Sequence, residues 1–142
     1  MPERESATIQ VLREWLLKAD NDLKNASHTL TLGQACPTDT VCFHAQQCVE
    51  KYLKALLAFL AVPFPKTHNI RDLMNLLPTK YRPDLDEDQQ DLLTDYATII
   101  RYPDAGLDIA LGEARKAVTV ARRVRREVRR LLPKAALRRR KK

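Results

Sequence analysis

The stretch from Val41 to Leu60, VCFHAQQCVEKYLKALLAFL, constrains the fold most, because it contains neither glycine nor proline. Good helix formers dominate it, so it predicts one long helix. At about 100° per residue, one broad arc of that helix is apolar and holds Val41, Cys42, Ala45, Cys48, Val49, Tyr52, Leu53, Ala55, Leu56, Phe59 and Leu60. The opposite arc is polar and holds His44, Gln47, Glu50, Lys51 and Lys54, with Phe43 among them. An aromatic ring in a polar arc indicates a face that a second chain covers or that lines a groove; a hydrated face with one exposed ring is the alternative.

The rest of the sequence predicts further helices, which Gly33 and several prolines separate. These helices span about residues 5–32, 69–77, 86–101 and 109–132. The sequence shows no strand pattern, internal repeat or glycine-rich phosphate loop. Short connections between long helices favour antiparallel neighbours. The expected fold is therefore all-α, an up-and-down bundle of four long helices with one short helix inserted between the second and third long ones.

The length of 142 residues fits a single domain. We expect a helical bundle over residues 1–133. A basic, disordered C-terminal tail is expected over residues 134–142, because this segment follows Pro133 and has too few apolar residues to fold alone. The net charge of +7 is uneven: from Arg122 onward, twelve Lys or Arg accompany the single acid Glu127. The basic charge is thus concentrated at the end of the sequence.

The composition gives no sign of a membrane or secreted protein. The richest apolar stretch, residues 53–64, is too short to span a bilayer, and the first ten residues lack an apolar signal region. Cys36, Cys42 and Cys48 form neither a CxxC pair nor an even disulfide set, and with scattered histidines they do not supply four zinc ligands. We expect a cytoplasmic protein that uses no metal and no cofactor and does not bind membranes.

His44, Gln47, Lys51 and Lys54 recur every three or four residues, so they form one ridge along the predicted central helix. Cations beside hydrogen-bonding groups on one ridge are suited to hold a phosphate. A hydrated helix face, on which Glu50 pairs with Lys54 at i, i+4, is the alternative.

Arg101, Tyr102 and Asp104 gather at the break that Pro103 makes between two predicted helices. Unpaired amides at the next helix start, with a guanidinium beside them, suit an anion site. An ion pair between Arg101 and an acid such as Asp104, which only fixes the turn, is the alternative. His68 lies at the mouth of the short helix and is either a ligand-binding imidazole or a satisfied loop residue.

The last predicted helix is rich in arginine around a narrow valine and leucine stripe. The candidates for nucleic-acid binding on it are Arg122, Arg125, Arg126 and Arg129. This composition suits salt-sensitive, sequence-independent contact with phosphate backbones. An anionic lipid surface or an acidic protein is the competing partner. A solubilising helix end whose cations complement the helix dipole is the third interpretation.

Three segments together resemble the HEPN domain of prokaryotes, the helical partner of minimal nucleotidyltransferases. They are FHAQQCVEKYLKALL from Phe43 to Leu57, KTH at 66–68 and RYP at 101–103, in the family's order. The resemblance spans about residues 12–131. It implies a module that binds nucleotide or RNA beside a separately encoded minimal nucleotidyltransferase, usually in a toxin–antitoxin-type pair. We also expect a homodimer, because Phe43 and the polar ridge indicate a surface that a second copy covers. It also favours a buried or interfacial role for Gln47 and Lys51.

The resemblance is incomplete for catalysis. Nuclease members of the family place a histidine after an arginine, with four to six residues between them. Arg101 corresponds to that arginine, but Gly106, Leu107 and Asp108 stand at the required offsets, and no histidine follows Arg101. A metal-independent RNase would need a non-standard base such as His44 or His68. A structural protein-interaction subunit is the other alternative.

Overall fold

The computed structural model describes the backbone of residues 2–99 and 108–138. These ranges hold only helical elements, and no strand. The helices are α1 (Pro2–Leu30), α2 (Thr38–Phe59), α3 (Ile70–Leu76), α4 (Glu87–Ile99), α5 (Leu111–Leu131) and α6 (Lys134–Leu137), with short 3₁₀ turns at Gly33–Ala35 and Thr79–Tyr81. The prediction of an all-α fold is confirmed. None of the helices in these ranges is long and apolar enough to cross a membrane.

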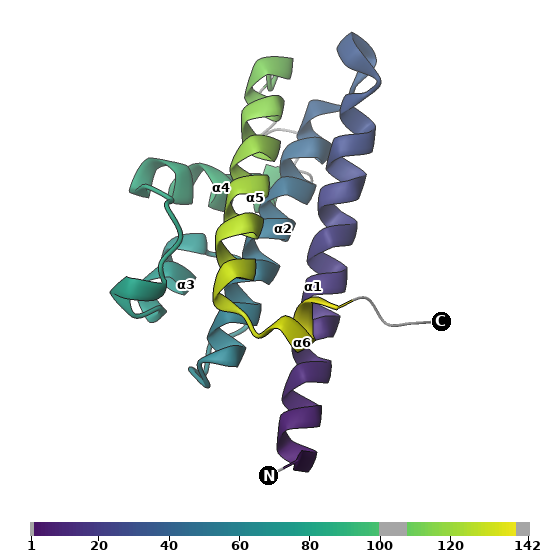
Figure 1. Cartoon of the computed structure of the whole chain (residues 1–142). Helices are drawn as coiled ribbons and strands as arrows, with labels where there is room; N and C mark the ends of the chain where they lie inside the picture. The colour runs from purple at the N-terminus through teal and green to yellow at the C-terminus, as the bar shows by residue number, and fades with distance from the viewer. Residues whose placement is uncertain (1, 100–107, 139–142) are drawn as a thin grey trace.

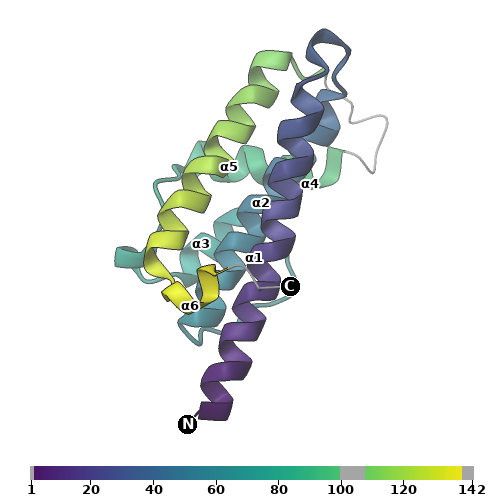
Figure 2. The same ribbon diagram turned by 45° about the vertical axis from the view of Figure 1, so that its right-hand side comes forward.

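The three longest helices, α1, α2 and α5, lie side by side, as Figure 1 shows. α1 runs antiparallel to both α2 and α5. α2 is the central element, because it contacts α1, α3, α4 and α5. The shorter α4 crosses behind α5 in the view of Figure 2 and packs on α2, while α3 packs on α2 and α4. α2 therefore carries the core on one side and the polar ridge on the other.

Most of the apolar arc of α2 is buried, as its spacing predicts, whereas Phe59 at the end of the arc is 36% exposed. Residues fully enclosed along this arc include Val41, Cys42, Ala45, Cys48, Val49, Tyr52, Leu53, Ala55 and Leu56. α1 meets them with Leu12, Leu16, Ala19 and Ala26, and α5 with the small residues Ala114, Ala117, Val118 and Ala121. Small side chains let the helix backbones approach closely. All three cysteines are free and buried, and burial raises the pKa of the Cys42 thiol to about 12.

α2 ends in a Schellman-type turn without a glycine. Ala61 adopts the left-handed conformation with φ 57°. The Val62 amide donates to the Leu57 carbonyl at 2.9 Å, and the Ala61 amide donates to the Ala58 carbonyl at 3.1 Å. The turn gives hydrogen bonds to two carbonyls at the end of the helix. Its left-handed position is occupied by Ala61, which has a Cβ, and not by glycine.

The structure differs from the predicted disordered tail over residues 134–142. Lys134–Leu137 form the short helix α6, in which Ala136 is buried. Arg13 of α1 fixes this helix, because its Nε and Nη2 donate to the Ala135 carbonyl at 3.1 and 2.8 Å. The segment is ordered by docking on α1 rather than by its own helix propensity. Residues 139–142 lie outside the described residues.

Candidate functional site

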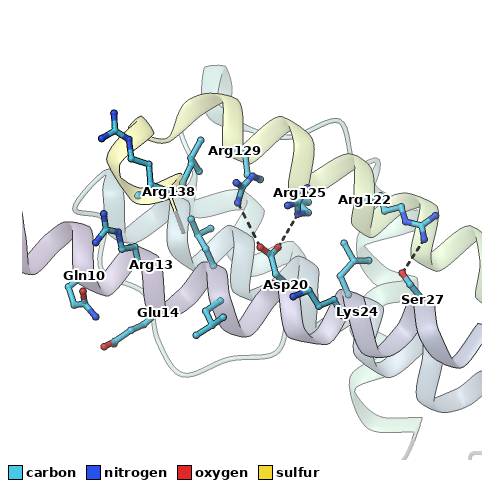
Figure 3. Close-up of a pocket in the computed structure, with 15 residues that line it drawn as sticks. Gln10, Arg13, Glu14, Asp20, Lys24, Ser27, Arg122, Arg125, Arg129 and Arg138 are labelled. Carbon is cyan, nitrogen blue, oxygen red and sulfur yellow. Dashed lines mark hydrogen bonds and ion pairs between the residues drawn. The ribbon is translucent and has the colours of Figure 1, made fainter. Parts of the chain in front are cut away.

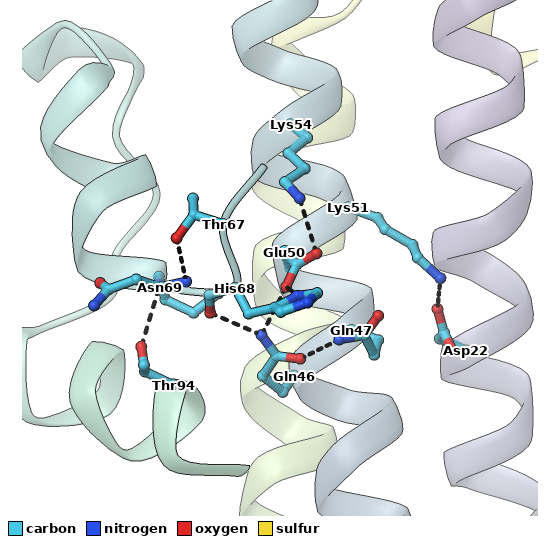
Figure 4. Close-up of polar contacts among 11 residues, drawn as sticks. Asp22, Gln46, Gln47, Glu50, Lys51, Lys54, Thr67, His68, Asn69 and Thr94 are labelled. Atoms are coloured by element: carbon cyan, nitrogen blue, oxygen red, sulfur yellow. Dashed lines mark hydrogen bonds and ion pairs between the residues drawn. The ribbon is translucent and has the colours of Figure 1, made fainter. Parts of the chain in front are cut away.

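The polar ridge of α2 is covered within the chain itself. Lys54 of the ridge and the neighbouring Gln46 and Glu50 are buried, whereas His44 and Lys51 are half-buried. α1 covers one part of the ridge, and the segment before α3 covers the other (Figure 4). Each part is organised around one carboxylate.

The first carboxylate is that of Asp22, which α1 supplies. Its Oδ1 lies 2.8 Å from His44 Nδ1, and its Oδ2 accepts a hydrogen bond of 2.5 Å from Lys51 Nζ. The ring of Phe43 stands edge-on to the His44 imidazole, with 5.5 Å between centroids. Asp22 thus neutralises Lys51 and orients His44 at once.

The second carboxylate is that of Glu50, whose side chain is only 4% exposed. Its Oε1 lies 2.8 Å from His68 Nδ1 and accepts from Gln46 Nε2 at 3.0 Å. Its Oε2 accepts from Lys54 Nζ at 3.0 Å. Gln46 Nε2 also donates to the His68 carbonyl at 3.2 Å, and Gln47 Nε2 donates to Gln46 Oε1 at 2.6 Å. The predicted pair of Glu50 with Lys54 is present, but it is buried instead of hydrated.

The arginines predicted to bind nucleic acid, here called the arginine row, lie on α5 on the other side of α1. They are Arg122, Arg125, Arg126 and Arg129. Arg125 Nε donates to Asp20 Oδ1 at 3.0 Å, and Arg129 Nη1 lies 3.8 Å from Asp20 Oδ2 (Figure 3). The buried Tyr52 hydroxyl donates to the same carboxylate. Arg122 Nη2 donates to Ser27 Oγ at 3.1 Å, and Arg126 is exposed. Burial of Arg125 acts to lower its pKa, but the hydrogen bond to Asp20, the charge of Asp20 and the contact with Tyr52 together outweigh it and raise the pKa of this guanidinium. The row therefore stays positively charged.

Asp20 and Asp22 separate the predicted residues into two groups. They stand two positions apart on α1, which is about 200° around the helix. Asp20 faces the arginine row of α5, whereas Asp22 faces the ridge of α2. His44, Gln47, Lys51, Lys54 and His68 belong to one side of α1, and the arginine row belongs to the other.

Comparison with known proteins identifies the family. The model of the HEPN domain family matches residues 12–131. The chain belongs to the HEPN family. HEPN domains are helical modules of the nucleotide-binding or RNase-like kind, and they commonly dimerise.

Two solved structures resemble this HEPN domain. The crystal structure of TT1696 from Thermus thermophilus is 32% identical over 85% of this chain and 98% of that chain, with a TM-score of 0.67. ST0689, an archaeal HEPN homologue, is 25% identical over 84% of this chain and 96% of that chain, with a TM-score of 0.61. No curated protein matches the sequence.

His44 and His68 of this HEPN domain are arranged alike. In the part of the chain that the structure describes, both imidazoles make their hydrogen bonds through Nδ1, each to a carboxylate. Such a carboxylate fixes the ring and leaves Nε2 as the nitrogen for contact with a ligand or for proton transfer. The His68 side chain is 53% exposed and that of His44 is 27% exposed, so both rings reach the surface.

Three predicted site residues, Arg101, Tyr102 and Asp104, lie outside the described residues. Described residues on each side of this segment contact the start of a long helix. Tyr96, before the segment, contacts the start of α5, and Ile109, after it, contacts the start of α2. The Tyr96 hydroxyl donates to Glu113 Oε2 at 2.6 Å, and Thr38 Oγ1 donates to the Ile109 carbonyl at 2.6 Å. Burial, together with the bond to Glu113, raises the pKa of Tyr96. Among the described residues, no group of His, Cys, Asp or Glu is placed to hold a metal ion.

Sequence reasoning missed the two aspartates and Gln46. Asp20 and Asp22 carry no local signal, because the apolar stripe of α1 predicts only that they lie beside it. Gln46 is fully buried but stands next to the polar ridge on the helical wheel. The sequence signals for the network around Glu50 are the adjacent glutamines Gln46 and Gln47 and the downstream histidine His68.

Proposed function

We propose that this HEPN domain binds a nucleotide or RNA on the ridge side of α2. The proposed ligand-binding residues are His44, Gln47, Lys51, Lys54, His68, Arg101, Tyr102 and Asp104. The observation that supports this function is the pair of carboxylate-held imidazoles at the ridge of α2: His44 lies on the ridge beside Lys51, and His68 reaches it from the segment before α3, where Glu50 also holds Lys54. In their protonated form the two oriented rings donate to a phosphate through Nε2, and the Lys51 ammonium supplies further donors.

Charge balance determines how such a ligand binds. Lys51 and Lys54 are each already paired with a carboxylate. Lys51, the more exposed of the two, exchanges Asp22 for a phosphate oxygen, while the buried Lys54 keeps Glu50 and helps to hold His68 in place. Binding by this exchange is weakened by salt, because the phosphate also releases its counterions.

The partner in this proposal is a separately encoded minimal nucleotidyltransferase in a toxin–antitoxin-type pair. The sequence has no glycine-rich phosphate loop of its own, so transfer chemistry belongs to the partner. We place the pair in the cytoplasm and this HEPN domain in a homodimer.

A metal-independent RNase is the second candidate function. The imidazoles favour it, because a carboxylate on Nδ1 orients Nε2 as a general base. His44 or His68 would then replace the histidine that is missing after Arg101.

One experiment separates these functions. The purified wild-type protein, Lys51→Ala and Arg101→Ala are incubated with labelled total RNA and labelled ATP at low and high salt, and both binding and cleavage are followed. Lys116→Ala is the matched control, because this lysine is exposed on α5. Salt-sensitive binding that both variants weaken, without cleavage, supports the binding module. Cleavage that Arg101→Ala abolishes supports the RNase, and unchanged binding in both variants refutes the ridge as the site.

The partner is tested by growth. Expression of this HEPN domain alone should slow bacterial growth, and co-expression of the nucleotidyltransferase encoded beside it should restore growth. Unimpaired growth with the HEPN domain alone would contradict the toxin–antitoxin part while leaving ligand binding standing.

A further inference from the structure

The arginine row forms one wall of an open groove between α1, α5 and α6 (Figure 3). The groove consists of a cavity of about 640 Å³ and an adjoining one of about 700 Å³. Both cavities are lined by Leu23, Arg122, Arg125, Arg129 and Leu137. The groove therefore follows the length of the arginine row.

The floor of this groove is aliphatic. Leu16, Leu17 and Leu23 of α1 face Ala136 and Leu137 of α6. Leu17 is 61% exposed, the largest exposed fraction among the large apolar side chains that the structure describes. An exposed leucine inside a concave surface gains free energy when an apolar partner covers it.

The outer rim of this groove is cationic and largely unneutralised. Arg122, Arg126 and Arg130 are exposed and repeat every four residues, so they form a row of about 12 Å along α5. Within the described residues, Asp20 pairs with the inner arginines Arg125 and Arg129, whereas Arg126 and Arg130 form no ion pair. The rim thus keeps positive charge for a partner.

We infer that this groove binds an acidic amphipathic helix of a partner protein. Apolar side chains of such a helix, spaced three and four residues apart, cover the leucine floor. Its acidic side chains recur at the same helical period as the rim arginines and pair with them. A floor of leucines with a rim of arginines is complementary to this ligand in both shape and charge.

RNA fits the same surface less well. Single-stranded RNA is usually held by bases that stack on aromatic rings. No aromatic residue lines either cavity in the described part of the chain. Phosphates would contact the rim, but the bases would be left against aliphatic side chains.

The C-terminal residues of the chain do not complement the groove in charge. Residues 139–142, which follow Arg138 at its edge, are Arg, Arg, Lys and Lys, so they would add positive charge. A second copy of this chain is the competing occupant of the groove, since its acidic side chains around the start of α4 are exposed: Asp84, Asp86, Glu87, Asp88 and Asp91. This inference is independent of the proposed function, because the groove and the ridge lie on opposite sides of α1.

The test uses the full-length protein and three labelled probes. The first is a synthetic helix of leucines at helical spacing with glutamates elsewhere. The second is its scrambled isomer, and the third is single-stranded RNA of equal charge. Binding is followed by fluorescence anisotropy. We expect the amphipathic peptide to bind at least roughly tenfold more tightly than the scrambled isomer, because only it covers the leucine floor.

Variants locate the site. Leu17→Glu should weaken peptide binding by roughly tenfold, and the double variant Arg126→Glu/Arg130→Glu should do the same. Arg115→Glu/Lys116→Glu makes the same charge change on exposed residues of α5 outside the groove and should leave binding unchanged. Leu17→Met keeps the apolar surface and should bind like the wild type. Circular dichroism confirms that each variant is folded.

Three results would overturn the inference. Equal binding of the scrambled peptide would make the contact one of charge alone. RNA binding that is tighter than peptide binding and insensitive to Leu17→Glu would assign the arginine row to nucleic acid. Self-association that blocks the peptide, seen by sedimentation and removed by Asp86→Lys/Asp88→Lys, would make a second copy the occupant.

Discussion

Replacing Glu50 by glutamine tests the buried polar network of α2 directly. The substitution keeps the size of the side chain and its contacts with Gln46 and His68, but it removes the negative charge. Lys54 then retains its positive charge with no carboxylate at 3.0 Å, in a position where only 9% of its side chain is exposed. Loss of one partner from a buried ion pair typically costs about 3–5 kcal/mol.

The aromatic surroundings of Lys54 leave that cost unchanged. Its ammonium lies 6.0 Å from the ring centroids of both Trp15 and Phe64, and this cation–π attraction is present with and without the Glu50 carboxylate. The expected loss in the free energy of unfolding for Glu50→Gln is therefore about 3–5 kcal/mol. In a chain of this length, that loss lowers Tm by about 10–17 °C.

Urea unfolding measures this loss, with far-UV circular dichroism and the fluorescence of Trp15, the sole tryptophan, as probes. Lys54→Met is the matched variant, because it removes the buried ammonium while Glu50 keeps its hydrogen bonds with Gln46 and His68. The double variant Glu50→Gln/Lys54→Met should be more stable than Glu50→Gln alone, since it has no orphaned charge. The reasoning fails if Glu50→Gln unfolds like the wild type, or if the double variant recovers no stability.

Two further predictions concern the end of α2 and the buried thiols. Ala61→Gly should raise the free energy of unfolding by about 0.5–1 kcal/mol, because glycine adopts φ 57° without a Cβ clash; Ala58→Gly, inside the helix, should instead lower it. Alkaline pH should destabilise the fold: burial raises the pKa of Cys42 from 9.0 to about 12, so the stabilisation present below pH 9 is lost between pH 9 and 12. Urea titrations at each pH should show a shallower loss for Cys42→Ala, and an equal loss would contradict this assignment.

The helices could be predicted from the sequence because their signals are local. Prolines and Gly33 mark the boundaries, and the apolar arc of α2 marks the core. The short helix was expected over about residues 69–77, and Asn69 caps α3, since its side chain accepts from the Asp72 amide at 3.0 Å. The last helix was expected to begin at about residue 109, but α5 begins at Leu111 after Ala110, with no side-chain cap.

The site depends on contacts between segments far apart in sequence, and these have no local signal. Phe43 and the polar ridge indicated a covering surface, yet nothing in the sequence specified that Asp22 and His68 of the same chain supply part of it. The arginine row was visible as composition, but its leucine floor appears only when α1, α5 and α6 come together. Homodimerisation and the ligand-binding role of the ridge remain predictions.

The two aspartates of α1 also fix where that helix can sit along its neighbours. Leu12, Leu16 and Ala19 recur at helical spacing, so apolar packing alone would tolerate a slide of α1 by one turn, about 5.4 Å. Such a slide would pull Asp20 away from Arg125 and Asp22 away from Lys51 together. Charge, rather than hydrophobic pattern, therefore sets the register of α1 against both sides of the bundle.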